Sequence, residues 1–410
     1  MLMQSRSIKS VIHLFLAYLC IFTCFNAFAS DNSFQFHGFL AQGFIKTSAN
    51  DFLGDSSEGS FDFGEAVVNG RYSVSDDWYL AAQLISRDYG DYHVVEQDID
   101  LDYGLLGGKI FSDSNQQLDF QIGMVKLPFG LLNIGRDIPS THLGILLPQH
   151  IYNEYNRNKN LSNYGGLLQY NITNDWGDIQ ASLAIGKINM SEKEHKEIFA
   201  TSAGISVDML NNFSHDTDVN KTVQVIYSTP DKHLRFGFTF NEDQYDYRVS
   251  SLNSSQEVIV KYSNYIYSLE YQIKDWSFLA EIYRRNQSTS IDLQFNNSHI
   301  QYTNKAPNTE FKYLQASYAI NDQVELFTRY EHGYLDTHNK YNYSPFGQSS
   351  SLGYHKNWVN GLDWYINDSL LFKAEYHRIK GCASLHWSNN DYSDLKDDWS
   401  MLMLQLVYHF

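Results

Sequence analysis

The stretch His233-Leu-Arg-Phe-Gly-Phe-Thr-Phe240 carries an apolar side chain at every second position. Leu234, Phe236, Phe238 and Phe240 fall on one face, and His233, Arg235 and Thr239 fall on the other. Successive side chains of a β-strand point to opposite sides, so this alternation predicts a strand with one face in an apolar medium and one in water.

A second stretch, Val95-Glu-Gln-Asp-Ile-Asp-Leu-Asp-Tyr-Gly-Leu105, at first resembles a calcium-binding loop. An EF-hand loop needs glycine at its sixth position and glutamate at its twelfth. Counted from Asp98, these positions hold Tyr103 and Lys109. The residues between the acids are apolar, namely Ile99, Leu101, Tyr103 and Leu105. We therefore expect a strand with these four side chains facing lipid, and neither a metal nor a cofactor.

Strands of this kind alternate with two classes of connection. Short polar turns, whose Asn, Asp, Ser and Pro residues favour tight turns, are expected at 75–77, 112–115, 173–175, 230–232, 274–275, 321–322 and 367–368. Longer polar connections are expected around 48–60, 88–94, 127–162, 189–219, 242–257, 287–308, 334–353 and 381–397. Seven turns and eight loops predict an all-β, transmembrane antiparallel β-barrel of about sixteen strands, with short periplasmic turns and long extracellular loops.

The prolines support this division because a proline removes one hydrogen bond from a strand ladder. All six of them fall in an expected turn or loop, at Pro128, Pro139, Pro148, Pro230, Pro307 and Pro345. A soluble β-sandwich or propeller would also show alternation, but it would not require strands of uniform length. No linker or change of composition divides the chain, so residues 30–410 are expected to form one barrel domain.

The first 29 residues have the order of a cleaved secretory signal peptide. Basic Arg6 and Lys9 precede an apolar run, and Ala27-Phe28-Ala29 forms an A-x-A cleavage site. A retained anchor is the alternative, although the apolar run is short for a spanning helix. Only Cys382 lies beyond this segment, so the exported protein has no internal disulfide. The net charge of −17 makes nucleic acid an unsuitable partner.

The last strand, Trp399-Ser-Met-Leu-Met-Leu-Gln-Leu-Val-Tyr-His-Phe410, resembles the closing strand of Gram-negative outer-membrane porins. Phe36-His-Gly-Phe-Leu-Ala-Gln-Gly-Phe-Ile-Lys46 and Met124-Val-Lys-Leu-Pro-Phe-Gly130 also look like segments of that family. The resemblance implies an outer-membrane location among lipid and lipopolysaccharide, recognition of Phe410 by the barrel assembly machinery, and a homotrimer. It also implies that the third outer loop, residues 127–161, folds into the pore as a constriction.

The expected lipid face of the 95–105 strand assigns its acids to the lumen. The pore-lining and constriction candidates are Glu96, Asp98, Asp100, Asp102, Arg71, Arg87, Lys126, Arg136 and Asp137. Same-face positions stand about 6.6 Å apart along a strand, so the acids are too widely spaced to bind one calcium ion together. We expect them to be hydrated or paired with bases on neighbouring strands, with Arg87 near Glu96 or Asp98.

The function predicted from these features is a porin-like channel for passive diffusion of small hydrophilic solutes and ions. A substrate-specific channel, for example for dicarboxylates or sugars, is the nearest alternative. A barrel enzyme or an adhesin is a more distant one, because the sequence contains no G-x-S-x-G, H-E-x-x-H or C-x-x-C motif. The prediction is therefore of a protein that is not an enzyme.

Overall fold

The computed structural model describes most of residues 33–410. The residues that it does not describe are 1–32, 90–98, 156, 204–206, 208–209, 211, 252–253, 296–297, 344–348 and 387–389. The predicted signal peptide, Pro345 and the acids Glu96 and Asp98 therefore lie outside the described residues.

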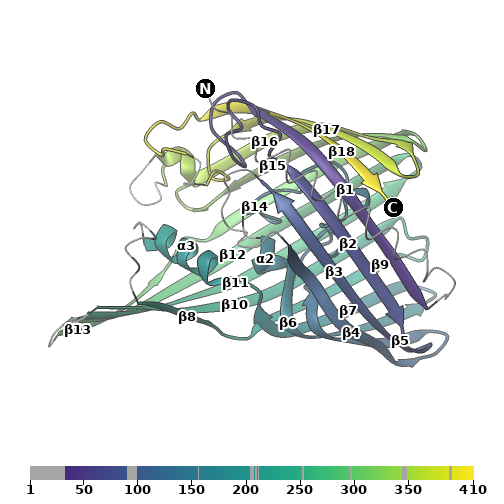
Figure 1. Cartoon of the computed structure of the whole chain (residues 1–410), viewed down its shortest axis with the longest axis horizontal. Helices are drawn as coiled ribbons and strands as arrows, with labels where there is room; N and C mark the ends of the chain where they lie inside the picture. The colour runs from purple at the N-terminus through teal and green to yellow at the C-terminus, as the bar shows by residue number, and fades with distance from the viewer. Residues whose placement is uncertain are drawn as a thin grey trace.

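The described chain forms one antiparallel sheet that closes on itself (Figure 1). Its first strands are β1 (Phe34–Thr47), β2 (Gly64–Ser73), β3 (Trp78–Asp88), β4 (Asp100–Ser112), β5 (Gln116–Lys126), β6 (Ser162–Asn174), β7 (Gly177–Ile188), β8 (Phe213–Thr217) and β9 (Asn220–Ser228). The others are β10 (Leu234–Ser251), β11 (Ser254–Ile273), β12 (Trp276–Phe295), β13 (Ser298–Lys305), β14 (Thr309–Asn321), β15 (Val324–Tyr334), β16 (Tyr354–Asn367), β17 (Leu370–Lys380) and β18 (Asp398–His409).

The eighteen strand segments occupy sixteen positions around the barrel. β8 and β9 both pair with β10, at different heights, and β13 and β14 share β12 in the same way. Each couple is therefore one interrupted strand, and Pro307 lies in the second interruption. The predicted fold class is confirmed as a closed antiparallel barrel of sixteen strands, and all seven short turns lie where the sequence placed them.

Pairing of β1 with β18 closes the barrel, with Phe39 opposite His409 and Thr47 opposite Met401. Beyond the strand proper, Gly38 and Phe410 exchange two backbone hydrogen bonds of 3.1 Å. A Cβ atom on Gly38 would lie 2.4 Å from the Phe410 ring. The terminal phenylalanine is thus packed into the seam between the first and last strands.

Two long connections expected from the sequence, at 242–257 and 287–308, are instead strand for most of their length. The outward side chains of β10 change from Leu234, Phe236, Phe238 and Phe240 to Glu242, Gln244, Asp246 and Arg248. The inward side chains change in the opposite sense, from Arg235, Thr239, Asn241 and Asp243 to Tyr245, Tyr247 and Val249. The expectation is wrong because the polar residues lie on the outer face of a strand that continues with its polarity reversed.

The reversed section belongs to a sheet that extends past the rest of the barrel rim, with β8 and β13 at its end (Figure 1). Helix α3 (Glu192–Ala203) packs on its inner, apolar face, where Phe199 and Tyr247 have ring centroids 5.4 Å apart. Among the described residues, no helix has both the length and the apolar character needed to cross a membrane.

A β-bulge in β4 corrects a second expectation. Leu101 pairs with Leu84 and Tyr103 pairs with Gln83, so Asp102 is an extra residue in the ladder. A bulge places two successive side chains on the same face. Asp102 and Tyr103 therefore both point inward, and Leu105 follows them toward the lumen, where it packs against buried apolar residues. Only Ile99 and Leu101 of the four predicted lipid-facing residues are largely exposed on the outer face.

Candidate functional site

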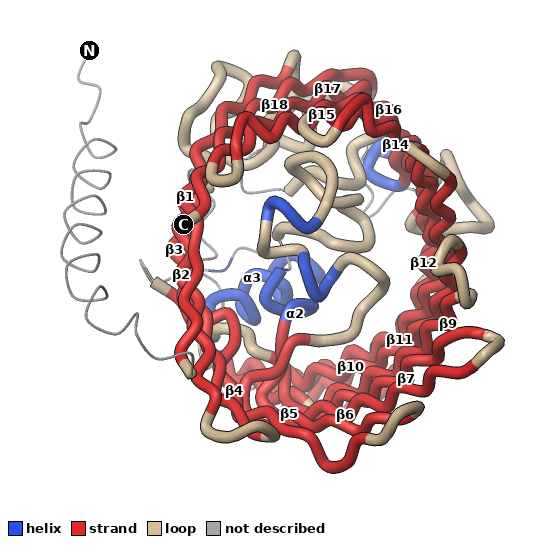
Figure 2. Tube along the Cα trace, turned by 90° about the vertical axis from the view of Figure 1, so that its right-hand side faces the viewer, coloured by secondary structure: helices blue, strands red, loops and turns tan. Residues whose placement is uncertain are grey.

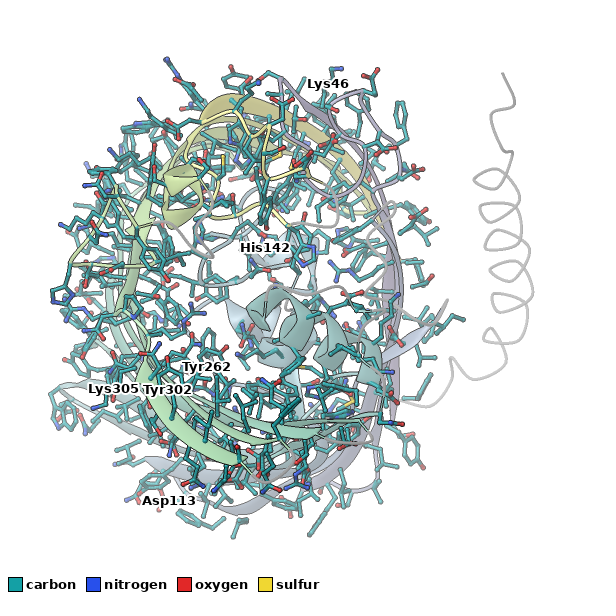
Figure 3. The ribbon with its side chains drawn as sticks, turned by 90° about the vertical axis from the view of Figure 1, so that its left-hand side faces the viewer. Lys46, Asp113, His142, Tyr262, Tyr302 and Lys305 are labelled. Carbon is teal, nitrogen blue, oxygen red and sulfur yellow. The ribbon has the colours of Figure 1, made fainter. Side chains whose placement is uncertain are left out.

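The connection of residues 127–161, between β5 and β6, lies inside the barrel (Figure 2). It contains the short helices η1 (Asn133–Gly135), η2 (Pro139–Thr141) and α2 (Arg157–Leu161). His142, in its middle, lies near the centre of the barrel (Figure 3). We call this segment the inner loop. Its ends stay on the wall, since the Leu127 amide donates to the Leu161 carbonyl at 2.9 Å.

Lys373 of β17 holds the middle of the inner loop. Its ammonium group donates to the carbonyls of Pro139, His142 and Gly144, the last two at 2.8 and 2.7 Å. Asp363 of β16 lies 3.3 Å from the same ammonium and accepts a bond from the Gly144 amide. Both charged side chains are fully buried. A buried ammonium is stable only when its donors are satisfied, so this arrangement fixes the loop backbone against β16 and β17.

Two neighbouring side chains extend this attachment. Glu375 of β17 accepts from the amides of Ile145 and Leu146 at 2.8 and 3.3 Å. Arg329 of β15 donates to the Leu146 carbonyl at 2.8 Å. Gly144 is required here, because its φ is +75° and a Cβ atom would lie 1.9 Å from the Glu375 carboxylate. The loop therefore approaches the wall more closely than any other residue type would allow.

Glu154 attaches the inner loop to a second part of the wall, at β3. Its carboxylate lies 2.5 Å from Arg87 of β3 and 2.8 Å from Arg136 of the loop. Arg87 also pairs with Glu65 of β2 at 2.9 Å. Although burial opposes ionisation, the Arg136 and Arg87 charges lower the pKa of Glu154 to about 2. The carboxylate is thus held ionised between two arginines.

A second ionic group joins the loop to β3, β4 and β5. Arg157 forms a two-pronged pair with Asp102, with both nitrogen–oxygen distances at 2.6 Å. Gln83 donates to Asp102 at 3.0 Å and also to Asp137 of the loop. Lys126 lies 2.5 Å from Asp137. Asp102 keeps the inward direction of Asp100, and the bulge that follows it turns Tyr103 toward the lumen as well.

The third attachment is to β12. Buried Glu281 accepts from the Leu131 amide at 2.9 Å and from the Tyr152 hydroxyl at 2.6 Å, both in the inner loop. Wall residues Ser268 and Tyr313 donate to the same carboxylate at 2.6 and 2.9 Å. Four donors around one carboxylate compensate its removal from water.

These attachments fill much of the barrel interior. Every one of the sixteen strand positions has an inward side chain that is buried: Phe39, Val67, Gln83, Asp102, Val125, Asn163, Ala184, Thr222, Asn241, Asn264, Glu281, Tyr313, Arg329, Val359, Lys373 and Met403. A barrel of this size has an aqueous lumen unless something enters it. The inner loop and the other inward-packed segments leave these side chains almost no contact with water.

The structure places the predicted residues in three groups. Those in contacts between the inner loop and the wall, or within the loop, are Asp102, Arg87, Lys126, Arg136 and Asp137. Asp100 is half-buried on the inner face of β4, and among the described residues it has no salt bridge. Arg71 lies apart from the loop, over the ring of Tyr79. Glu96 and Asp98, the expected partners of Arg87, lie outside the described residues.

Several residues that hold the inner loop are outside the list of pore-lining and constriction candidates, namely Glu154, Arg157, Glu281, Arg329, Asp363, Lys373 and Glu375. Their position on polar strand faces or in the loop is visible in the sequence. Their partners are mostly backbone groups of an irregular segment, however, and no sequence pattern identifies such contacts.

Comparison with known proteins agrees with this architecture. Neither a protein-family model nor a curated protein matches the sequence. Among solved structures, OmpF of Salmonella typhi in complex with daunomycin is 12% identical, covering 92% of this chain and 97% of its own, with a TM-score of 0.56.

Two further structures each have 10% identity and a TM-score of 0.51. The outer membrane channel DcaP of Acinetobacter baumannii covers 92% of this chain and 97% of its own. The anion-selective porin from Comamonas acidovorans covers 92% of this chain and 99% of its own. The chain therefore has the fold of Gram-negative porins, as the closing strand suggested.

Replacing Lys373 should loosen the inner loop. Lys373→Met removes the donor for three carbonyls and leaves Asp363 buried without its cation, so we expect a loss of about 3–5 kcal/mol of stability. The measurement is the unfolding midpoint of the refolded protein in detergent. In Lys373→Met/Asp363→Asn the stranded charge is absent, so the double variant should be more stable than the single one. Equal stability of wild type and Lys373→Met would contradict this attachment.

The Glu154 attachment should depend on pH. The pKa of Glu154 is lowered from 4.5 to about 2, so its contribution is complete above about pH 4.5 and disappears as the pH falls through 2. We expect the stability difference between wild type and Glu154→Gln to be constant from pH 5 to 7 and to shrink below about pH 4. Thermal unfolding of both proteins across this range provides the test. A difference that is independent of pH would remove Glu154 from the ionic group.

Proposed function

We propose that this protein is an outer-membrane channel through which small hydrophilic solutes and ions diffuse passively. The observation that carries the proposal is the inner loop, which crosses a closed barrel and is attached to its wall on three sides. Because the outer face is apolar while much of the inner face is polar, the barrel suits a membrane on the outside and water within. The porin fold of the structural neighbours supports the same conclusion.

The filled interior favours a restricted channel over a wide one. Inward side chains that would line an open pore are buried in the described structure. Solute flux must therefore use narrow passages beside the loop or follow its displacement. This observation gives weight to the substrate-specific channel as a second candidate, because a loop that excludes most solutes can discriminate among them.

The remaining parts of the proposal concern export and assembly. They comprise cleavage after about Ala29, recognition of Phe410 by the barrel assembly machinery, and a homotrimer surrounded by lipid and lipopolysaccharide. The packing of Phe410 against Gly38 in the barrel seam supports a role for this residue in closure. No enzymatic activity forms part of the proposal.

Planar-bilayer recording tests the channel directly. Purified wild-type protein should give stepwise ionic current, and Lys373→Met should give larger or more frequent openings because the middle of the inner loop is released. Arg235→Met is the matched control, since Arg235 pairs with Glu270 at the short-turn end and does not touch the loop. Absence of current from wild type and Lys373→Met alike would refute a channel.

Asp100 is the acid most suited to influence ion selectivity. It is half-buried on the inner wall, whereas Asp102 is neutralised by Arg157. Asp100→Asn should lower the cation-to-anion permeability ratio, read from the reversal potential in a salt gradient. Asp113→Asn removes the same single negative charge at an exposed short turn, away from the lumen. It should leave the permeability ratio unchanged. An unaltered reversal potential in Asp100→Asn would exclude this acid from the selective region.

A further inference from the structure

A polar cavity of about 400 Å³ lies at the short-turn end of the barrel, against the inner wall of β2–β6. The side chains that matter for its chemistry are Arg71, Tyr79, Lys109, Gln117, Asp119, Gln121 and Gln169. It is distinct from the contacts of the inner loop, which lie further from the short turns. A volume of this size accommodates a molecule of monosaccharide dimensions.

One wall of the cavity is a stacked platform. The Arg71 guanidinium carbon lies 3.7 Å from the centre of the Tyr79 ring. Tyr79 pairs with Gly107 across β3 and β4, and a Cβ atom on Gly107 would lie 2.3 Å from that ring. Gln121 of β5, which pairs with Gly107 on the other side, donates to the Tyr79 hydroxyl at 3.2 Å. Glycine thus leaves room for the tyrosine to lie over the wall, and the amide fixes it there.

Stacking on Tyr79 leaves Arg71 able to bind a ligand. Its guanidinium face is covered by Tyr79, while its N–H edge stays free for a planar anion. Arg71 is exposed to the cavity and, among the described residues, has no carboxylate within ion-pair distance. The other cation of the cavity, Lys109, is 3.3 Å from Asp77. Arg71 is therefore the cation of the lining that has no ion pair among the described residues, while Asp76 and Asp119 are the lining carboxylates beside Asp77.

The β5 and β6 side of the cavity presents a carboxylate and amides, in contrast to the cationic Arg71. Asp119 accepts two bonds from Gln117, at 2.9 and 2.7 Å, and retains further lone pairs. Gln169 of β6 pairs with Asp119 across the sheet and lines the same cavity. The Asp119 carboxylate accepts hydrogen bonds from hydroxyl groups and the glutamine amides donate to them, whereas the carboxylate repels a second carboxylate or a phosphate.

We propose that this cavity binds small sugar acids, molecules that combine one carboxylate with several hydroxyl groups. Arg71 takes the carboxylate through its N–H edge, and Asp119 with the neighbouring glutamines takes the hydroxyls. The inference rests on the proposed function, because it names the class of solute that such a channel retains at its short-turn end. A neutral sugar leaves Arg71 unused, and an aliphatic carboxylate leaves Asp119 unused.

Calorimetry on the full-length mature protein in detergent tests the site with three probes: glucuronate, glucose and hexanoate. Glucuronate should bind at least about tenfold more tightly than either of the others, as one charge-assisted bidentate contact implies. Arg71→Met should weaken glucuronate binding by about tenfold or more. Asp119→Asn should weaken glucuronate but not hexanoate. Gly107→Ala, which displaces Tyr79 without removing a polar group, should also weaken glucuronate.

Arg235→Met, another inward arginine at the same end of the barrel, is the matched control and should bind glucuronate as wild type does. Each variant is first shown by gel electrophoresis, with and without heating, to keep the mobility of a folded barrel. Equal binding of glucose and glucuronate, or full binding by Arg71→Met, would overturn the proposal. Calorimetry does not require a conducting pore, so glucuronate binding without bilayer current would refute the channel and keep the site. Bilayer current without glucuronate binding would refute the site and keep the channel.

Discussion

Completeness of the backbone hydrogen-bond ladder is the constraint on which this structure depends. The outward face of the barrel is apolar, and an unpaired amide or carbonyl in an apolar medium costs several kcal/mol. The sheet must therefore have no edge at that level, which the pairing of β1 with β18 achieves. The breaks at which β8 gives way to β9 and β13 to β14 lie toward the long-loop end. The polarity reversal along β10 marks where this demand ends.

Closing sixteen strands creates a second problem, because the interior becomes too wide for wall side chains to fill. The inner loop fills it with irregular backbone, whose amides and carbonyls then need partners away from water. Lys373, Glu375, Arg329 and Glu281 supply those partners. The charged residues on the inner faces of β12, β15 and β17 thus have a structural explanation: they replace the water that would otherwise solvate the loop backbone.

The sequence predicted the properties that repeat along the chain. Strand number, the seven short turns and the strand faces follow from alternation and turn chemistry, which are local. The sequence-based prediction failed where a strand departs from strict alternation. The bulge at Asp102 turns Tyr103 and Leu105 inward, and no local pattern signals it.

The prediction of residues 242–257 as a loop fails for a related reason. The expected alternation assumes one apolar outer face along the whole strand, and that face becomes polar beyond the rim. The pairing of Arg87 with Glu154 of the inner loop was not predicted. No pattern within a strand reports on a carboxylate that a folded loop brings to it.

The distribution of attachments along the inner loop indicates how it can move. Lys126, Asp102 and Arg157 act close to its two ends, where the backbone is already paired to β5 and β6. The Lys373 contacts act at residues 139–144, midway between the ends, where the loop has no ladder of its own. Displacing the middle therefore requires breaking the Lys373 contacts, while the ionic group at the ends can persist as a pivot. Because Lys373 binds backbone carbonyls, the strength of this attachment is nearly independent of the loop side chains.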